Sequence, residues 1–329
     1  MPPAFRPAAT KPEALTAPVR QAATYSGPWR LGRRAAIVVL IAGIALWLAD
    51  ASLRPKDPAC PWSAALAHRW AAWELNALTW FYDARVHIVE RDAAAGQVQV
   101  ESPWGRFWAP EAGSDTDGRK LVAYLIAEHV WMSRRSAEEQ VRPGETVIDC
   151  GAHVGTFTRM ALNRGARRVL AVEANPANQE CLRRNFRAEM ASGKVVLLPY
   201  AAWDAEMQLT FRLAGGNSGS GSAVLGVGDD TIRVPARPLD AMLAEAGAGK
   251  VDYLKMDIEG AERNALRGAM QTLRRDRPRV MLESYHLPDD PAVLPALLRQ
   301  AWSGYAERCG ACRADARDGA LKPYVLYFH

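Results

Sequence analysis

The chain has 329 residues, of which 49% are hydrophobic, enough for one domain with a substantial core plus an additional N-terminal segment. Its net charge of +5 is unevenly placed, because residues 1–56 contain eight basic and two acidic residues. A nucleic-acid-binding domain would carry its positive charge on the folded part instead. Composition therefore argues against nucleic acid as a partner and favours anionic lipid headgroups.

The N-terminal region contains a candidate membrane anchor. Residues 1–34 form a basic arm that is rich in alanine and proline and has no apolar periodicity, which predicts disorder. Residues 35–53 are nearly as long as the ~20 residues that a helix needs to cross a bilayer. We expect an anchor helix there, either a single span or a helix in the interface. A cleaved secretory signal peptide and a soluble core helix are the two other interpretations.

The orientation of this anchor follows from two conflicting arguments. Basic residues before the apolar segment slightly outnumber those after it, which favours a cytoplasmic N-terminus. The cofactor predicted below is made in the cytoplasm, and on that ground we expect the catalytic domain to face the cytoplasm. An interfacial helix satisfies both arguments.

Residues 57–140 are expected to form an accessory region made of a helix and short strands. Between Ser63 and Tyr82, apolar and aromatic residues recur at helical spacing, namely Leu66, Trp70, Trp73, Ala77 and Trp80. We favour packing of this face on the domain as core, and a place at the lipid headgroup layer is the alternative. Alternation of apolar and polar residues predicts short strands at 86–90, 98–101 and 107–108. Helical periodicity predicts a further helix at 121–131.

The five cysteines are an odd number in a chain large enough to fold without covalent cross-links, which argues against a disulfide framework. Cys309 and Cys312 have the spacing of a redox pair or of half a zinc site. No second such pair exists to complete four ligands, so we expect ordinary thiols.

A strand, a glycine turn and a helix follow one another from residue 146. Thr146–Cys150 is a buried-strand pattern, Gly151 to Gly155 form the turn, and residues 156–163 can form a helix. Ligands of open α/β sheets bind beyond the carboxyl ends of the strands, where a glycine turn lets the backbone approach. Asp149, at the strand end, can offset a positive charge on the ligand.

The next predicted strand, residues 168–172, ends in Glu173, about 20 residues beyond the turn, where a carboxylate can accept both ribose hydroxyls. The Gly-x-Gly-x-x-Gly spacing of a dinucleotide site is absent. These features predict a positively charged, adenosine-containing ligand. Further strands of the same sheet are predicted at 195–198, 251–257 and 279–283. Helices are predicted between the strands, at 176–190 and 261–273.

Two motifs, VIDCGAHVG at 147–155 and VDYLKMDIEGAE at 251–262, resemble those of the FkbM-type methyltransferase family. The resemblance extends from about Val141 to the C-terminus, which we take as the methyltransferase domain, residues 141–329. It implies an α/β, Rossmann-like, doubly wound and mostly parallel sheet of the class I methyltransferase type. It also implies S-adenosylmethionine as cofactor and O-methylation of sugar or secondary-metabolite hydroxyls.

The resemblance transfers roles to individual positions. Asp149, Gly151 and Gly155 match the cofactor loop, and Glu173 matches the ribose carboxylate. His153 stands where the family usually has Asn, so the side-chain contact of that Asn is not carried over to this chain, whereas the backbone of the turn is expected to bind the cofactor. The second motif contributes Lys255, Asp257, Glu259 and Glu262.

Methyl transfer to an alcohol requires an acceptor oxygen held close to the methyl carbon and a base for its proton. Asp257, at the end of its strand, is the first candidate for this role, with helix capping as the alternative. His286 is a second candidate base, and Lys255 either pairs with a carboxylate or contacts substrate. Glu259 and Glu262 lie three apart and offer carboxylates for a cation together with Asp257, but the sequence leaves metal dependence unknown.

A glycine-rich segment within residues 213–224 is either a lid over the acceptor or an ordinary hairpin loop. The predicted function is a membrane-associated O-methyltransferase whose acceptor is a small molecule, a glycan or a lipid-linked sugar. The alternatives are a nucleotide-dependent oxidoreductase and a catalytically silent, membrane-anchored binding module on the same fold.

Overall fold

In the computed structural model, the described residues are 29–49, 60, 62–111, 118–135, 139–213, 219–225, 230–314 and 321–329. Within the first two helices, side chains are described only for residues 35–45 and from residue 71 onward. The chain divides into two compact units, Met1–Asp50 and Ala51–His329.

The first unit contains helix α1 (Trp29–Ala49). Its described side chains are all exposed, and those of Ile37, Val39 and Ile41 are 54%, 71% and 60% exposed. Among the residues that the structure describes, no helix is long and apolar enough to cross a membrane. The predicted membrane-spanning helix is therefore not supported. Residues 50–53 of the predicted anchor, and residues 1–28 of the predicted disordered arm, lie outside the described residues.

The second unit is built around a seven-stranded sheet with the order β12-β13-β11-β10-β4-β5-β6. The strands from β11 to β6 are mutually parallel, and β13 and β12 each pair antiparallel with their neighbours. This confirms the predicted α/β fold with a mostly parallel sheet. The strands are β4 (Thr146–Cys150), β5 (Arg168–Val172), β6 (Val195–Leu198), β10 (Tyr253–Met256), β11 (Arg279–Glu283), β12 (Glu307–Ala314) and β13 (Leu321–Phe328).

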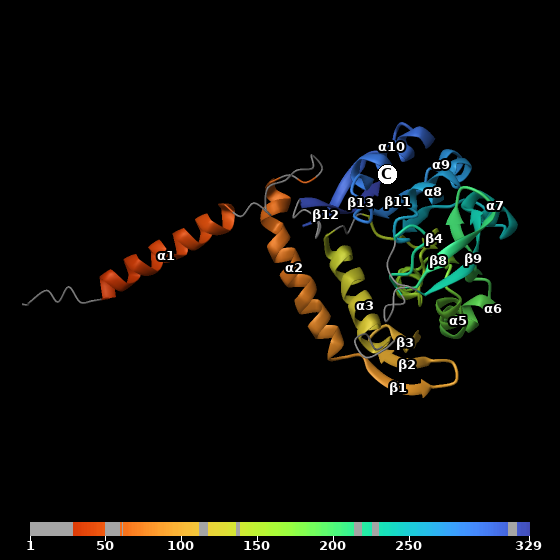
Figure 1. Cartoon of the computed structure of the whole chain (residues 1–329), viewed down its shortest axis with the longest axis horizontal. Coiled ribbons are helices and arrows are strands. Elements are labelled where there is room, and N and C mark those ends of the chain that lie inside the picture. Colours follow the sequence, from red (N-terminus) through yellow and green to blue (C-terminus); the bar gives the residue numbers. More distant parts are fainter. Residues whose placement is uncertain are drawn as a thin grey trace, which may run out of the picture. The chain divides into compact units, whose positions relative to one another are not determined.

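Helices cover both faces of this sheet (Figure 1). They are α2 (Trp62–Asp83), α3 (Gly118–Arg135), α4 (Thr156–Asn163), α5 (Pro176–Asn185), α6 (Arg187–Ala191), α7 (Leu239–Glu245), α8 (Glu262–Arg267), α9 (Met270–Asp276) and α10 (Asp290–Ala301). Successive residues of a strand point to opposite faces. Val147 and Tyr253 accordingly pack in one core cluster with residues of α3 and α4, whereas Ile148 and Leu254 pack in the other with residues of α7 to α10.

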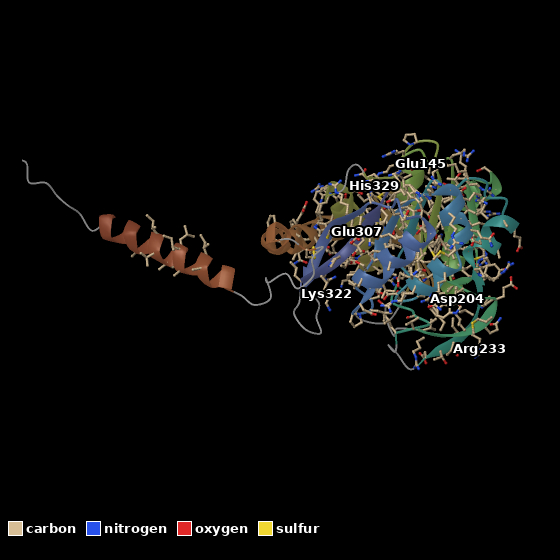
Figure 2. The ribbon with its side chains drawn as sticks, turned by 90° about the horizontal axis from the view of Figure 1, so that it is seen from above. Glu145, Asp204, Arg233, Glu307, Lys322 and His329 are labelled. Carbon is tan, nitrogen blue, oxygen red and sulfur yellow. A yellow bond between two sulfur atoms is a disulfide. The ribbon has the colours of Figure 1, made fainter. Side chains whose placement is uncertain are left out.

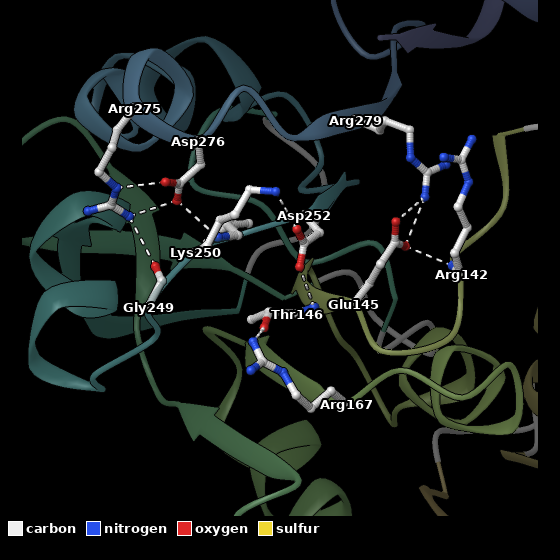
Figure 3. A network of polar contacts seen from close by, with 11 residues as sticks. Arg142, Glu145, Thr146, Arg167, Gly249, Lys250, Asp252, Arg275, Asp276 and Arg279 are labelled. Atoms are coloured by element: carbon white, nitrogen blue, oxygen red, sulfur yellow. Dashed lines mark hydrogen bonds and ion pairs between the residues drawn. The ribbon is translucent and has the colours of Figure 1, made fainter.

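The amino ends of the parallel strands are joined by polar contacts (Figure 3). Asp252 accepts a hydrogen bond from the Thr146 backbone N–H at 3.0 Å and pairs with Lys250 at 2.9 Å. The Arg279 guanidinium donates to both oxygens of Glu145 at 2.7 and 2.8 Å. These bonds satisfy the polar groups at one edge of the sheet, and the opposite edge, where the strands end, is the one with candidate site residues.

The accessory region belongs to the same compact unit. Its three-stranded sheet, β1 (His87–Asp92), β2 (Gln97–Ser102) and β3 (Gly105–Pro110), packs on α3, which lies beside α2 (Figure 1). The Asn185 side chain joins this region to the glycine turn of the central α/β fold, because it accepts from the Trp108 N–H at 2.6 Å and donates to the Val154 carbonyl at 2.9 Å.

The face of α2 that we expected to pack as core is partly open. The Trp73 and Trp80 side chains are 67% and 76% exposed, so the core interpretation is wrong for these two residues. The reason is that a different face of α2 is the one that packs. α2 packs on α3 through Ala71, Leu75 and Leu78, which belong to the core that α3 shares with the central sheet. The side chains of Leu66 and Trp70 lie outside the described residues.

The predicted helix at 261–273 is divided into α8 and α9. The division falls at Gly268, where a Cβ atom would overlap the Trp203 carbonyl oxygen. Trp203 belongs to a third sheet that the sequence did not reveal, formed by β7 (Ala201–Trp203), β8 (Met207–Arg212) and β9 (Thr231–Pro238).

The C-terminal hairpin of β12 and β13 also went unpredicted, and it extends the central sheet by two antiparallel strands. Figure 2 labels Glu307 of β12 and Lys322 of β13 on this hairpin. It brings Cys312 within bonding distance of Cys60, and the two form a disulfide across 252 residues of sequence. The expectation of ordinary thiols at 309 and 312 is therefore wrong for Cys312, because the pairing depends on a long-range contact of β12 with the start of α2.

Candidate active site

The glycine turn after β4 lies against the loop that follows β10. Gly151 has φ 82°, and a Cβ atom there would overlap the Asp257 carbonyl oxygen. Gly155 has φ 92°, and a Cβ atom there would overlap the Phe186 ring. Glycine is required at both positions because the backbone is left-handed and its neighbours are close. The turn is thereby fixed at the carboxyl edge of the sheet.

Glu173, directly after β5, is held by the same turn. Its Oε2 accepts from the His153 backbone N–H at 2.8 Å and its Oε1 from the Asn175 N–H at 2.8 Å. Burial raises the pKa of Glu173, and the two backbone donors partly offset that rise. Oε1 also accepts a longer bond from the Asn178 side-chain amide at 3.4 Å, and Oε2 retains a further lone pair for a ligand hydroxyl.

His153 takes the left-handed conformation, with φ 51°, that points its N–H toward Glu173. A non-glycine residue in this region is uncommon, although Asn and His tolerate it better than most. Burial, with the charge of Lys255 as a smaller cause, lowers the pKa of His153 to about 3, so its ring is neutral. The backbone contact to Glu173 is therefore made even though His153 replaces the Asn that the FkbM-type family usually has at this position.

A cavity opens above these residues and encloses roughly 860 Å³ of empty space, its mouth included. Of the predicted site residues, it is lined by Gly151, His153, Glu173, Lys255, Asp257 and Glu259. The other three, Asp149, Gly155 and His286, are not among its lining residues.

Asp149 acts beneath the cavity rather than in it. It is fully buried, and its Oδ2 accepts from the Thr158 hydroxyl at 2.7 Å while Oδ1 lies 3.4 Å from Lys255 Nζ. Burial raises the pKa of Asp149, and Lys255 opposes that rise. Among the contacts that the structure describes, the ion pair with Lys255 links Asp149 to the lining of the cavity.

Lys255 joins the two predicted motifs. Its Nζ donates to the Gly151 carbonyl at 2.8 Å and lies 3.9 Å from Asp257 Oδ2. Burial alone would lower the pKa of Lys255, but the charges of Asp149 and Asp257 outweigh it, so the ammonium stays protonated. The ammonium therefore ties the glycine turn to the loop after β10, which fits the paired-lysine interpretation.

Three carboxylates surround His286. Its Nδ1 lies 2.9 Å from Glu262 Oε1, and its Nε2 lies 3.5 Å from Glu259 and 3.7 Å from Asp257. Burial alone would lower the pKa of His286, but these carboxylates raise it to about 10. An imidazole that is already protonated cannot accept a proton, so His286 does not fit the expected role of base.

Glu259 has the properties of a base instead. Burial raises its pKa to about 7, even though His286 opposes that rise. It lines the cavity with φ 53°, a conformation that costs energy for a non-glycine residue. Its carbonyl accepts a hydrogen bond from the Ser222 hydroxyl at 2.6 Å, which fixes this strained residue.

The sequence did not predict several residues that line the cavity. Leu125 and His129 come from α3, outside either motif, and the His129 Nε2 lies 3.0 Å from the Thr156 hydroxyl oxygen. Gly219 and Gly221 belong to the glycine-rich segment, whose composition was the one available signal. Aromatic side chains complete the wall, namely Phe157, Tyr200, Trp203 and Phe211.

A glycine turn and an acidic residue at adjacent carboxyl strand ends define a Rossmann-like, nucleoside-binding class of α/β domain. Residues 149–310 match the sequence model of the methyltransferase FkbM domain. The chain therefore carries a domain of the FkbM methyltransferase family, as its two motifs predict.

Several solved structures are similar to the chain. A methyltransferase FkbM from Methylobacillus flagellatus KT has 18% identity and a TM-score of 0.42, over 67% of this chain and 56% of its own length. A precorrin-6y C5,15-methyltransferase from Geobacter metallireducens GS-15 has 13% identity and a TM-score of 0.36, over 60% and 85%. A ribosomal protein L11 methylase from Lactobacillus delbrueckii subsp. bulgaricus has 13% identity and a TM-score of 0.35, over 61% and 77%. No curated protein sequence matches the chain.

Proposed function

We propose that the protein is an S-adenosylmethionine-dependent O-methyltransferase whose acceptor is a hydroxyl of a sugar, a glycan or a lipid-linked or secondary metabolite. The observation that supports this best is the setting of Glu173. Two backbone N–H groups fix its carboxylate at the wall of the cavity, next to the glycine turn. A carboxylate at this place in the fold can accept hydrogen bonds from both ribose hydroxyls.

S-adenosylmethionine supplies an electrophilic methyl group when it is bound. The chain must then position the acceptor oxygen and remove its proton. In this proposal Asp257 orients the acceptor hydroxyl, and Glu259, whose pKa is about 7, takes the proton. The His286 imidazolium lies between the two carboxylates and Glu262, so it positions both.

The cavity wall favours an uncharged acceptor. Its lining includes the carboxylates of Glu173, Asp257 and Glu259 but the single ammonium of Lys255, which is already engaged with Asp257 and a carbonyl. A phosphate group beside two carboxylates would be repelled. Aromatic walls with a few placed polar groups suit a neutral polyhydroxylated molecule.

Calorimetric titration of the full chain with S-adenosylmethionine tests the cofactor. We expect Glu173→Ala to weaken binding by roughly 10- to 100-fold, because hydrogen bonds to a charged group contribute about 1.5–3 kcal/mol. Glu180→Ala is the matched control, since Glu180 lies on the exposed side of α5 and pairs only with Arg183 among the contacts described. Equal binding by both variants and the unmodified protein, or no binding by a well-folded protein, would contradict the proposal.

We also propose that α1 associates with a membrane and that the catalytic domain faces the cytoplasm, where the cofactor is made. Support for the membrane association comes from the run of apolar side chains on α1 that are exposed in the structure and from the basic residues before it, whereas the orientation rests on the location of the cofactor alone. Fractionation of cells expressing the full chain or a form without residues 1–50 tests this. Equal recovery of both forms in the soluble fraction would refute it.

A further inference from the structure

Three cysteines converge where the hairpin of β12 and β13 meets the start of α2. Cys60 and Cys312 are joined by the disulfide, and both are almost completely buried with Leu321 in a small apolar cluster. The third, Cys309, is half-buried and has its Sγ 3.2 Å from the Cys312 Sγ. A thiol therefore contacts a disulfide sulfur directly.

This contact requires an irregular strand. In a regular strand, residues three apart are separated by about 10 Å and point to opposite faces. Between Cys309 and Cys312 the pairing of β12 with β13 shifts register twice, on either side of Ala311. Gly310 permits this path, because a Cβ atom there would overlap the Tyr327 ring. The irregularity brings the two sulfur atoms to one side of the strand.

We propose that Cys60, Cys309 and Cys312 form a thiol–disulfide exchange site, in which the disulfide moves between Cys60–Cys312 and Cys309–Cys312. The Cys309 thiolate attacks the Cys312 sulfur and forms the new sulfur–sulfur bond. The bond to Cys60 breaks, and the Cys60 sulfur leaves with the electron pair and takes up the proton that Cys309 released. The step is isoelectronic, so it needs no oxidant or reductant.

The exchange changes how α2 is attached. With the disulfide at Cys60, the segment that leads into α2 is covalently joined to β12, which contacts α2. After exchange, that covalent joint is replaced by a bond within β12. α2 packs on α3, and α3 contributes Leu125 and His129 to the cavity. The covalent attachment at Cys60 is therefore linked, through these two helices, to the wall of the proposed active site.

The released Cys60 thiol is also the group that a small-molecule disulfide would modify by exchange. Exchange at Cys312 leaves Cys60 as the one member of the trio with a free sulfur. Cys150 and Cys181 are buried, and burial raises the pKa of both thiols, so neither competes as a nucleophile.

Alkylation and peptide mass mapping of the full chain, without added reductant, test the proposal. We expect iodoacetamide to label Cys60 in one fraction of the molecules and Cys309 in the rest, with Cys312 always disulfide-bonded. The fractions should be independent of protein concentration, and they should be reached faster as the pH rises toward the thiol pKa.

Two variants sharpen this test. Cys309→Ser should lower the labelling of Cys60 about tenfold or more, because the exchange partner is gone, whereas Cys181→Ser should leave the distribution unchanged. The proposal is overturned when Cys309 in the unmodified protein is labelled completely at every pH while the Cys60–Cys312 disulfide stays intact. That result needs no variant, so it holds even where a substitution prevents folding.

Discussion

Replacing Lys255 with methionine should strongly destabilise the second unit. Lys255 is 3% exposed, and its ammonium lies 3.4 Å from Asp149 Oδ1, a carboxylate that is fully buried. Without the ammonium, the buried Asp149 carboxylate is stabilised only by the hydrogen bond from the Thr158 hydroxyl among the contacts described, and its negative charge has no access to water. Breaking a buried pair by removing one partner costs about 3–5 kcal/mol, and we expect a loss of that size.

Urea unfolding of the full chain, in which the folded fraction of the second unit is monitored, measures this loss in the free energy of unfolding. The control is Lys250→Met, because Lys250 pairs with Asp252 at 2.9 Å but its side chain is 69% exposed. An exposed pair contributes about 0–1 kcal/mol. The double variant Asp149→Asn with Lys255→Met should recover part of the loss, since the uncompensated charge is then removed. A loss below about 1 kcal/mol for Lys255→Met, or no recovery in the double variant, would refute the argument.

Two further predictions concern the loops around the cavity. Glu259 must be deprotonated to act as a base, and its pKa is about 7, so kcat/KM should rise as the pH increases through about 7. Glu259→Gln should remove this rise from the pH profile, whereas Asp257→Asn should keep it. The same raised pKa means that the contribution of Glu259 to the free energy of unfolding falls as the pH rises toward about 7, while activity rises. A rise of kcat/KM near pH 7 that persists in Glu259→Gln would contradict the assignment. Gly151→Ala should lower the free energy of unfolding by about 1–3 kcal/mol more than Gly144→Ala, because both have positive φ but only position 151 would overlap a neighbour, the Asp257 carbonyl; equal losses in urea unfolding would show that the contact is unimportant.

The local features of this protein could be predicted from the order of its amino acids. Strands such as Thr146–Cys150 and Arg168–Val172 are short, mostly apolar runs bounded by glycine and acidic residues, so their pattern, order and carboxyl ends can be read along the chain. The two motifs likewise lie in contiguous residues. That is why the mostly parallel sheet, the family of the domain and the candidate residues around Glu173 and Asp257 could be stated before the structure.

Other properties depend on neighbours that are distant in the chain, and these could be found only in the folded molecule. The pKa of His286 depends on three carboxylates from the loop after β10 and from α8, which turn a candidate base into a fixed cation. The place of Asp149 beneath Lys255, the exposure of Trp73 and Trp80, and the Cys60–Cys312 disulfide depend in the same way on packing across the fold. Periodicity and spacing describe one segment at a time, whereas charge, burial and covalent pairing are set by the residues that folding brings together.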